Sequence, residues 1–432
     1  MNTSKLALLG GSKTISRSFK RYNPIGPEEL EAAKAVIESG VLSQFLGAWH
    51  EDFYGGPKVR EFEAAACKYF GVKHAVTVNS WTSGLVVAIG AIGIEPGDEV
   101  IVTPWTMSAT ASAILHWNAI PVFADIDPQS YNLCPTAIEQ CISPYTKAIV
   151  VADIFGQSAD ISEIMTLAKQ YGLKVISDTA QAPGALYKSS FAGTLADIGG
   201  YSLNYHKHIH TGEGGILVTN NPEFAERMQL IRNHAEAVVD KMGVQNLANM
   251  IGHNFRLGEI ECAIGIEQLK KLKHLSASRQ SIAQRLNEGL SELNGLLIPT
   301  VGSDRTHVYY VYAMQLEARN IGISRDIICQ ALNAEGLNVS NRYQNIHLLP
   351  AYQRKIAFGS HGFPWTSDIC KREISYEKGI CPVAESLNDE SYLGLGLCSF
   401  DYERPDVDLV VQAFHKVWRN LDDLRAISEN PV

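Results

Sequence analysis

Short apolar runs alternate with helical patterns over roughly the first half of the chain. The apolar runs are candidate strands, at residues 74–78, 99–103, 120–125, 147–153, 174–178 and 215–219. Before and between them, apolar positions recur at helical spacing in residues 26–40, 83–93, 107–118 and 161–172. Nearly continuous apolar strands separated by helices are typical of a mostly parallel sheet that helices cover on both faces. The pattern therefore predicts an α/β fold.

The pattern changes after about residue 256. A long helical stretch covers residues 256–293, an alternating strand pattern covers 307–316, and further helical patterns cover 324–336 and 404–421. These elements predict a smaller α+β unit that a long helix joins to the first. We expect an N-terminal arm (1–25), a large domain (26–270) and a small C-terminal domain (271–432).

Composition narrows the class of protein. Hydrophobic residues make up 46% and charged residues 19% of the 432 residues, as in an ordinary soluble globular protein. The net charge of -9 argues against nucleic acid or an anionic membrane as the main partner. No run approaches the roughly 20 apolar residues that a membrane span needs. The cysteines are scattered without a CxxC pair, which favours free thiols in the cytoplasm and no zinc site.

In a parallel sheet, ligands bind at the carboxyl ends of the strands, so the residues that follow each strand are candidates. After strand 74–78, the turn "NSWTSG" places Ser80, Thr82 and Ser83 at a helix start. Such residues can bind an anion or can simply cap the helix. Asp178 ends the strand 174–178, where its carboxylate could hold a cationic ring nitrogen or a metal, or cap the next helix.

The stretch "YSLNYHKHIHTGEGGILVT" contains one lysine, Lys207. Desolvation and neighbouring cations lower the pKa of a lysine, and such an amine can form a Schiff base with an aldehyde. His206, His208 and His210 alternate along the same stretch, but no acid or cysteine accompanies them at the spacing of a metal site, so we predict no metal. Hydroxyls at a helix start, an acid and a lysine together match what pyridoxal 5'-phosphate (PLP) requires.

Several longer motifs resemble the DegT/DnrJ/EryC1/StrS family of PLP-dependent sugar aminotransferases, from about residue 25 to the C-terminus. "VTVNSWTSGL" resembles the phosphate turn S-G-T-x-x-L of that family, and "VISDTAQAPGA" resembles its E-D-x-A-Q-A-x-G motif. "YSLNYHKHIHTGEGG" resembles S-F-x-x-x-K-x-x-x-x-G-E-G-G, and "GHNFRLGEIECAIGIEQL" matches G-x-N-x-R-M-x-E-x-x-A-A-I-G-x-x-Q-L. The resemblance implies fold type I of the PLP-dependent transferases.

The resemblance also implies a role for individual residues. It assigns Lys207 to the Schiff base with the cofactor and Asp178 to the pyridine nitrogen. It places Gln181 near the ring hydroxyl. For the cofactor phosphate it implies Thr82, the Ser83 backbone and Ser202, and Ser80 in the same turn is a further cofactor-binding candidate. Asn254 would reach the phosphate of the neighbouring subunit, which implies a homodimer with shared active sites.

Two positions depart from the motifs of the family. Trp81 stands where the family has the glycine of S-G-T, and Met107 stands where an aromatic residue stacks on the ring. A polarisable thioether can cover a ring face, and Trp81 is a candidate for substrate selection. Hydrogen-bonding groups suit a polyhydroxylated substrate, so Tyr205, His206, His208 and His210 are substrate candidates, with packing of the loop as the alternative.

The resemblance implies transfer of an amino group from L-glutamate or L-glutamine to a keto or aldehyde carbon of a sugar-like acceptor, with an oxidised octulosonate as one possible acceptor. Two alternatives are a PLP-dependent nucleotide-sugar dehydratase and a non-catalytic PLP-binding regulator. The sugar dehydratases of the family have histidine at the lysine position, so Lys207 favours amino transfer. The departures at Trp81 and Met107 motivate the regulator.

Overall fold

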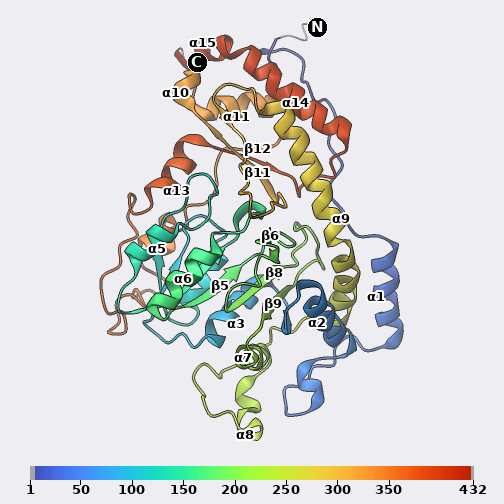
Figure 1. Ribbon diagram of the computed structural model, residues 1–432, viewed down its shortest axis with the longest axis vertical. Helices are drawn as coiled ribbons and strands as arrows, with labels where there is room; N and C mark the ends of the chain where they lie inside the picture. The colour runs from blue at the N-terminus through green and yellow to red at the C-terminus, as the bar shows by residue number, and fades with distance from the viewer. Residues whose placement is uncertain (1–4, 430–432) are drawn as a thin grey trace.

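A seven-stranded sheet with the order β1-β9-β8-β5-β4-β2-β3 forms the centre of the computed structural model, which describes residues 5–429 (Figure 1). Its strands are β1 (His74–Val78), β2 (Glu99–Val102), β3 (Ile120–Phe123), β4 (Thr146–Ala152), β5 (Lys174–Asp178), β8 (Ile198–Ser202) and β9 (Gly215–Thr219). Strands β3, β2, β4, β5 and β8 pair in parallel, while β9 is antiparallel to both of its neighbours. The predicted mostly parallel sheet is confirmed.

Helices cover both faces of this sheet, as the sequence predicted. Along β9, Leu217 packs in the same apolar cluster as residues of α3 (Trp81–Ala91) and α7 (Pro222–Arg232). Its neighbours Ile216 and Val218 pack instead with α2 (Pro57–Phe70) and α9 (Glu259–Leu290). Successive side chains of a strand point to opposite faces. The sheet therefore lies between two helical layers.

The remaining helices of this part of the chain are α1 (Pro27–Ser39), α4 (Ala109–Leu115), α5 (Pro135–Cys141), α6 (Ile161–Tyr171) and α8 (Val239–Met242). A short hairpin, β6 (Leu186–Tyr187) with β7 (Ser190–Phe191), follows β5. No helix within residues 5–429 is both long and apolar enough to cross a bilayer.

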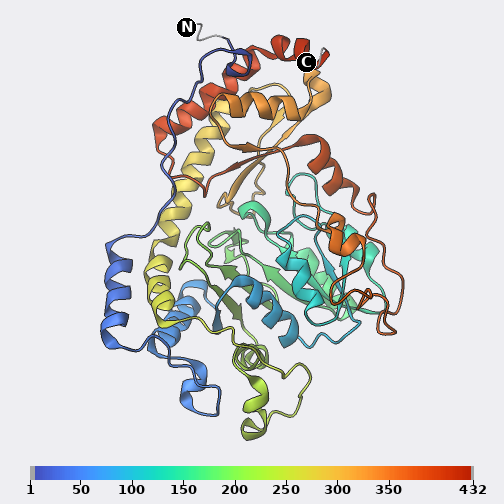
Figure 2. The same cartoon turned by 180° about the vertical axis from the view of Figure 1, so that it is seen from behind.

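A second sheet lies beyond the end of the long helix α9, which runs along one side of the molecule and connects the two parts (Figures 1 and 2). Its order is β10-β11-β13-β12, with strands β10 (Leu296–Leu297), β11 (Val311–Leu316), β12 (Val339–Ser340) and β13 (Tyr392–Gly396), all antiparallel. Side chains of this sheet form a separate apolar core with the end of α9 and with α11 (Arg325–Ala334) and α14 (Arg404–Arg419). Short helices α10 (Ala318–Ile321), α12 (Pro350–Gln353), α13 (Pro382–Ser386) and α15 (Leu421–Glu429) complete the chain.

The N-terminal segment packs on this second core. Leu6, Ile15 and Phe19 belong to the same apolar cluster as α11 and α14. The carboxylate of Glu335 accepts hydrogen bonds from Ala7 N at 2.7 Å and from Thr14 N at 2.9 Å, and it pairs with Lys416 Nζ at 2.8 Å. Of the predicted arm, residues 1–4 lie outside the described residues, as do 430–432 at the other end.

Residues 343–391 pack on the large sheet although they follow the long helix. Ile346, Tyr376 and Leu387 belong to the first apolar core. The predicted domain boundary at residue 270 falls inside α9, and part of the predicted small domain (271–432) joins the large unit.

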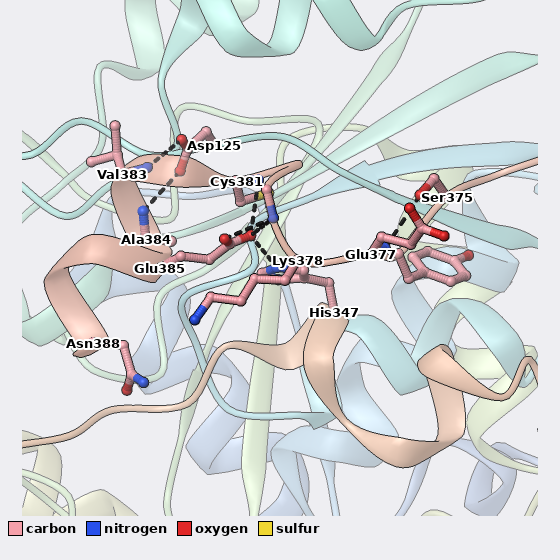
Figure 3. A network of polar contacts seen from close by, with 12 residues as sticks. Asp125, His347, Ser375, Glu377, Lys378, Cys381, Val383, Ala384, Glu385 and Asn388 are labelled. Carbon is pink, nitrogen blue, oxygen red and sulfur yellow. Dashed lines mark hydrogen bonds and ion pairs between the residues drawn. The ribbon is translucent and has the colours of Figure 1, made fainter.

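A polar network fastens this segment next to β3 (Figure 3). Asp125, just after β3, accepts hydrogen bonds from the backbone of Val383 at 2.8 Å and of Ala384 at 3.0 Å, at the start of α13. Glu385 of the same helix pairs with the fully buried His347 at 2.9 Å. The segment is therefore held by hydrogen bonds to the carboxylates of Asp125 and Glu385 as well as by apolar contacts.

We expect Glu335→Ala to destabilise the protein on the order of 3 kcal/mol, because it leaves the Lys416 ammonium buried without its carboxylate. The midpoint of urea unfolding reports the loss, and limited proteolysis reports release of the N-terminal segment. The matched control is Asp401→Ala, which removes the partner of Lys20 in the same segment. That pair is exposed, with side-chain exposures of 72% and 46%, so the control should change the midpoint little. Equal effects of the two substitutions would contradict this account.

Candidate active site

A cavity of about 180 Å³ opens at the carboxyl edge of the parallel strands. Its lining includes Ser80 after β1, Asp153 after β4, Asp178 at the end of β5 and Ser202 at the end of β8. This is the edge at which a parallel sheet positions ligands. The ends of three predicted strands, 74–78, 147–153 and 174–178, therefore meet around one space, together with the end of β8, which the sequence pattern did not predict.

Asp178 lies fixed in the wall of this cavity. Its Oδ1 accepts a hydrogen bond from the indole Nε1 of Trp81 at 2.6 Å, and its Oδ2 accepts one from Thr110 Oγ1 at 2.7 Å. Burial raises the pKa of the Asp178 carboxyl, and the donors together with the positive charge of Lys207 counteract part of that rise. The arrangement provides an oriented acceptor for a positively charged group.

Lys207 also lines the cavity, and its side chain is only 8% exposed. Its Nζ lies 4.3 Å from the ring centroid of Tyr310, in a cation–π contact. No carboxylate among residues 5–429 forms an ion pair with this ammonium group. Burial lowers the pKa of Lys207 to about 8, although the negative charge of Asp178 opposes the shift. A substantial fraction of this amine is therefore neutral and nucleophilic near pH 8.

The start of α3 presents hydroxyl groups to the cavity. Ser80 caps the helix, because its Oγ accepts a hydrogen bond from Ser83 N at 3.1 Å. Ser80 and Thr82 line the cavity, as does Ser202 from β8, whereas Ser83 lies outside the lining and donates its hydroxyl to Asn79 Oδ1 at 2.7 Å. The capping interpretation thus describes Ser80 and Ser83 in this structure. A helix N-terminus with adjacent hydroxyls also suits a phosphate.

Gln181 enters the cavity with its amide held at both ends. Its Oε1 accepts a hydrogen bond from Phe155 N at 3.0 Å, and its Nε2 donates to the hydroxyl of Tyr343 at 3.0 Å. Tyr343 belongs to the segment that packs on the large sheet after the long helix. The second hydrogen of Nε2 remains available for a ligand.

The mouth of the cavity is polar. Asn204, His206 and Glu213 belong to its lining, and Asn204 Nδ2 donates to Glu213 Oε1 at 2.8 Å. The amide oxygen of the same asparagine, Asn204 Oδ1, is buried without a hydrogen-bond partner. Met107 also lies here, with 58% of its surface exposed. The side chains of Asn204, His206 and Glu213 can form hydrogen bonds with a polar substrate.

Apart from Ser83, four more of the predicted residues lie outside the lining of this cavity. Tyr205 is 68% exposed and points elsewhere, while His208 is fully buried with its Nε2 2.8 Å from the carbonyl oxygen of Val308. His210 accepts a hydrogen bond from Gly212 N through its own ring. For His208 the geometry favours packing of the loop. Asn254 is exposed and follows the half-buried His253, outside the lining of the cavity in this chain.

Sequence reasoning missed Asp153, Thr110, Tyr310 and Tyr343. Asp153 was recognised as a strand end but given no role; it is buried beside Asp178, and burial raises its carboxyl pKa to about 6. The other three contact Asp178, Lys207 and Gln181 and carry no local motif. Within residues 5–429, no group of three or more histidine, cysteine or acidic side chains is placed to hold a metal ion.

The donor set of this cavity fits PLP. Asp178 offers a carboxylate to a ring nitrogen, Lys207 offers an unpaired amine to an aldehyde, and Ser80, Thr82 and Ser202 offer hydroxyls to a phosphate.

The comparisons with known proteins agree with this geometry. The family model described as the DegT/DnrJ/EryC1/StrS aminotransferase family matches residues 28–391. The chain belongs to this family and is an aminotransferase.

Relatives match over nearly their whole length. The spore coat polysaccharide biosynthesis protein SpsC of Bacillus subtilis (strain 168) is 32% identical over 92% of this chain and 96% of its own. The L-glutamine:2-deoxy-scyllo-inosose aminotransferase of Streptoalloteichus tenebrarius is 32% identical over 98% of this chain and 99% of its own. A solved structure, the aminotransferase from Psychrobacter cryohalolentis, superposes with a TM-score of 0.80 at 27% identity, covering 94% of this chain and 100% of that one.

In the cofactor-free protein, we expect the rate at which Lys207 reacts with amine-modifying reagents to depend on pH with an apparent pKa of about 8. The reason is that burial disfavours its ammonium form. Asp178→Asn should lower this value further, since it removes the negative charge that favours the ammonium form. Reductive methylation as a function of pH, followed by peptide mass spectrometry, gives the pKa of this one lysine. Glu213→Gln at the mouth is the control and should leave the value unchanged. A lysine that titrates near 10.5 would contradict the geometry described here.

Proposed function

We propose that this aminotransferase uses PLP to move an amino group from L-glutamate or L-glutamine to a ketone or aldehyde carbon of a sugar-like acceptor. One observation carries the proposal: a buried lysine without an acidic partner shares a cavity with a buried, oriented aspartate. A buried ammonium group without an acidic partner is costly, and this cost favours the neutral, nucleophilic amine that a Schiff base with an aldehyde requires.

When bound, PLP supplies the electron sink that makes the donor's α-proton acidic. Lys207 would hold the cofactor through its Nζ, and the same Nζ, once displaced by the donor, would be the base that takes the α-proton of the donor and gives it to the cofactor in the 1,3-proton shift. Its pKa of about 8 suits both roles near neutral pH. Asp178 keeps the ring nitrogen protonated, and Gln181 hydrogen-bonds the ring hydroxyl with the orientation that Tyr343 and Phe155 N impose.

The phosphate of the cofactor would lie at the start of α3, held by Ser80, Thr82, the Ser83 backbone and Ser202. Because Ser83 N already donates to Ser80 Oγ in this structure, the Ser83 contribution requires a shift or sharing of that hydrogen bond. Met107 lines the cavity, and its thioether would be the group that covers one face of the ring. Trp81 lies in the wall of the site and donates a hydrogen bond to Asp178.

Polar side chains at the mouth support a polyhydroxylated acceptor. Asn204, His206 and Glu213 present hydrogen-bonding groups there, and Asn204 Oδ1 lacks a partner. The names of two relatives mention a spore coat polysaccharide and a keto-inositol acceptor, which agrees with a sugar or cyclitol class. An oxidised octulosonate is one acceptor of this class, giving an 8-amino-3,8-dideoxy-octulosonate product.

A homodimer with shared sites is part of the proposal. Asn254 is exposed and its neighbours His253 and Phe255 line a hollow that also contacts Thr82 and Ser83. Ile251 in the same hollow is 68% exposed, so the hollow offers apolar surface that a second copy could cover. A second copy packed on this face would bring its Asn254 toward the phosphate.

We expect L-glutamate or L-glutamine to convert the visible absorption band of the PLP-loaded protein to the ultraviolet band of the aminated cofactor. Adding the keto acceptor should restore the visible band, so a panel of keto-inositols, free keto sugars and the oxidised octulosonate identifies the acceptor. Lys207→Arg should lower the rate at least about 100-fold, the usual contribution of a positioned base. Lys188→Arg, a surface lysine, is the matched control and should be unaffected. A visible band that no amino donor changes would contradict the proposal and favour a non-catalytic regulator.

Mixed dimers test the shared site. Lys207→Ala and Asn254→Ala should each abolish or strongly reduce activity when expressed alone, while the two proteins refolded or coexpressed together should regain about a quarter of wild-type activity. The reason is that half of the dimers are mixed and each mixed dimer keeps one site with both residues intact. Recovery is impossible if Asn254 acts within its own subunit, so the absence of complementation would overturn the shared-site arrangement.

A further inference from the structure

Trp81 stands at the first position of α3 and is only 6% exposed. Its indole N–H does not meet a neutral carbonyl or hydroxyl group. It donates to Oδ1 of Asp178 at 2.6 Å, in the wall of the cavity. A hydrogen bond to an ionised group is shorter and roughly twice as strong as one between neutral groups.

Glycines on three elements make room for this tryptophan. A Cβ at Gly200 of β8 would lie 2.4 Å from the indole ring, and one at Gly84 of α3 would lie 2.8 Å from it. A Cβ at Gly215 of β9 would lie 3.0 Å from the Trp81 backbone. The backbone around the indole therefore leaves space for a tryptophan because glycines stand at these positions. The tryptophan is an integral part of the site.

The donors around Asp178 can be counted against its lone pairs. An ionised carboxylate has about four lone-pair positions. Trp81 Nε1 and Ala180 N, at 3.3 Å, take Oδ1, while Thr110 Oγ1 takes one position of Oδ2. One lone-pair position therefore remains, on Oδ2, the oxygen to which Trp81 does not donate. The two side-chain donors act on different oxygens, so the carboxylate cannot rotate without breaking a hydrogen bond.

We propose that Trp81 is a positioning residue: its indole N–H keeps Asp178 ionised and turned so that one free lone pair of the carboxylate meets the ring nitrogen of PLP. This inference rests on the proposed function. It gives a role to the tryptophan that replaces a glycine of the family motif. Without the indole donor, the carboxylate becomes more basic and takes the proton from the ring nitrogen, which weakens the electron sink.

The experiment compares the PLP-loaded wild type with Trp81→Phe, which keeps an aromatic ring and removes the N–H. The pH midpoint of the visible band of the lysine-bound cofactor should rise by about one unit, as expected for loss of a hydrogen bond to a charged group. Release of PLP on dialysis should become several-fold faster. The matched control is Trp365→Phe, another buried tryptophan whose N–H donates to the Tyr376 hydroxyl at 2.9 Å, and it should change neither value.

An unchanged midpoint in Trp81→Phe, with the wild type showing a normal visible band, overturns this inference and leaves the proposed function standing. A wild type that forms no visible band with PLP contradicts the proposed function instead. If Trp81→Phe does not fold, the test uses protein that keeps Trp81 and measures the NMR signal of its indole N–H. In the cofactor-free protein, Asp178→Asn should shift the indole N–H NMR signal of Trp81 upfield, and an unmoved signal overturns the hydrogen bond itself.

Discussion

The site depends on keeping a carboxylate charged inside a protein core. An ionised carboxylate that is buried without donors costs far more than the few kcal/mol by which a domain is stable. Asp178 avoids that cost because α3, α4 and the turn after β5 each direct a donor at it. The positions of these three elements are therefore coupled, and the glycines around the Trp81 indole follow from the same requirement.

Much of the large sheet could be predicted because buried parallel strands are short continuous apolar runs. Strands β1, β5 and β9 have the predicted bounds. Strand β8 was missed because its sequence, "IGGYS", has two glycines and no apolar run. Both glycines are required by tertiary contacts: a Cβ at Gly199 would meet the Gly193 carbonyl, and one at Gly200 would meet Trp81. The predicted strand 307–316 begins only at Val311, because Val308 N bonds to Gly156 O outside the sheet.

The site residues, like the strands, divide into those that the sequence predicts and those that it misses. Lys207, Asp178 and Gln181 lie in motifs whose spacing the chain preserves, so they could be found from sequence. Thr110 lies among small residues in a helix and looks like an ordinary core position. Tyr310 and Tyr343 come from the far side of α9, more than 100 residues from the groups they contact. No local pattern encodes such contacts, because they form only when segments that are distant in the sequence pack together.

The firm attachment of segment 343–391 has a consequence for the cavity, because this segment carries Tyr343. Tyr343 fixes the amide of Gln181, so any movement of its segment would turn that amide and change which group it offers to a ligand. The buried His347–Glu385 pair and the Asp125 contacts to α13 hold the same segment on the large sheet. Movement of the segment would break these hydrogen bonds to carboxylates, so the segment moves only at a cost. The second half of the chain thus acts on the site through rigidity, because it holds the side chains that contact Lys207 and orient Gln181.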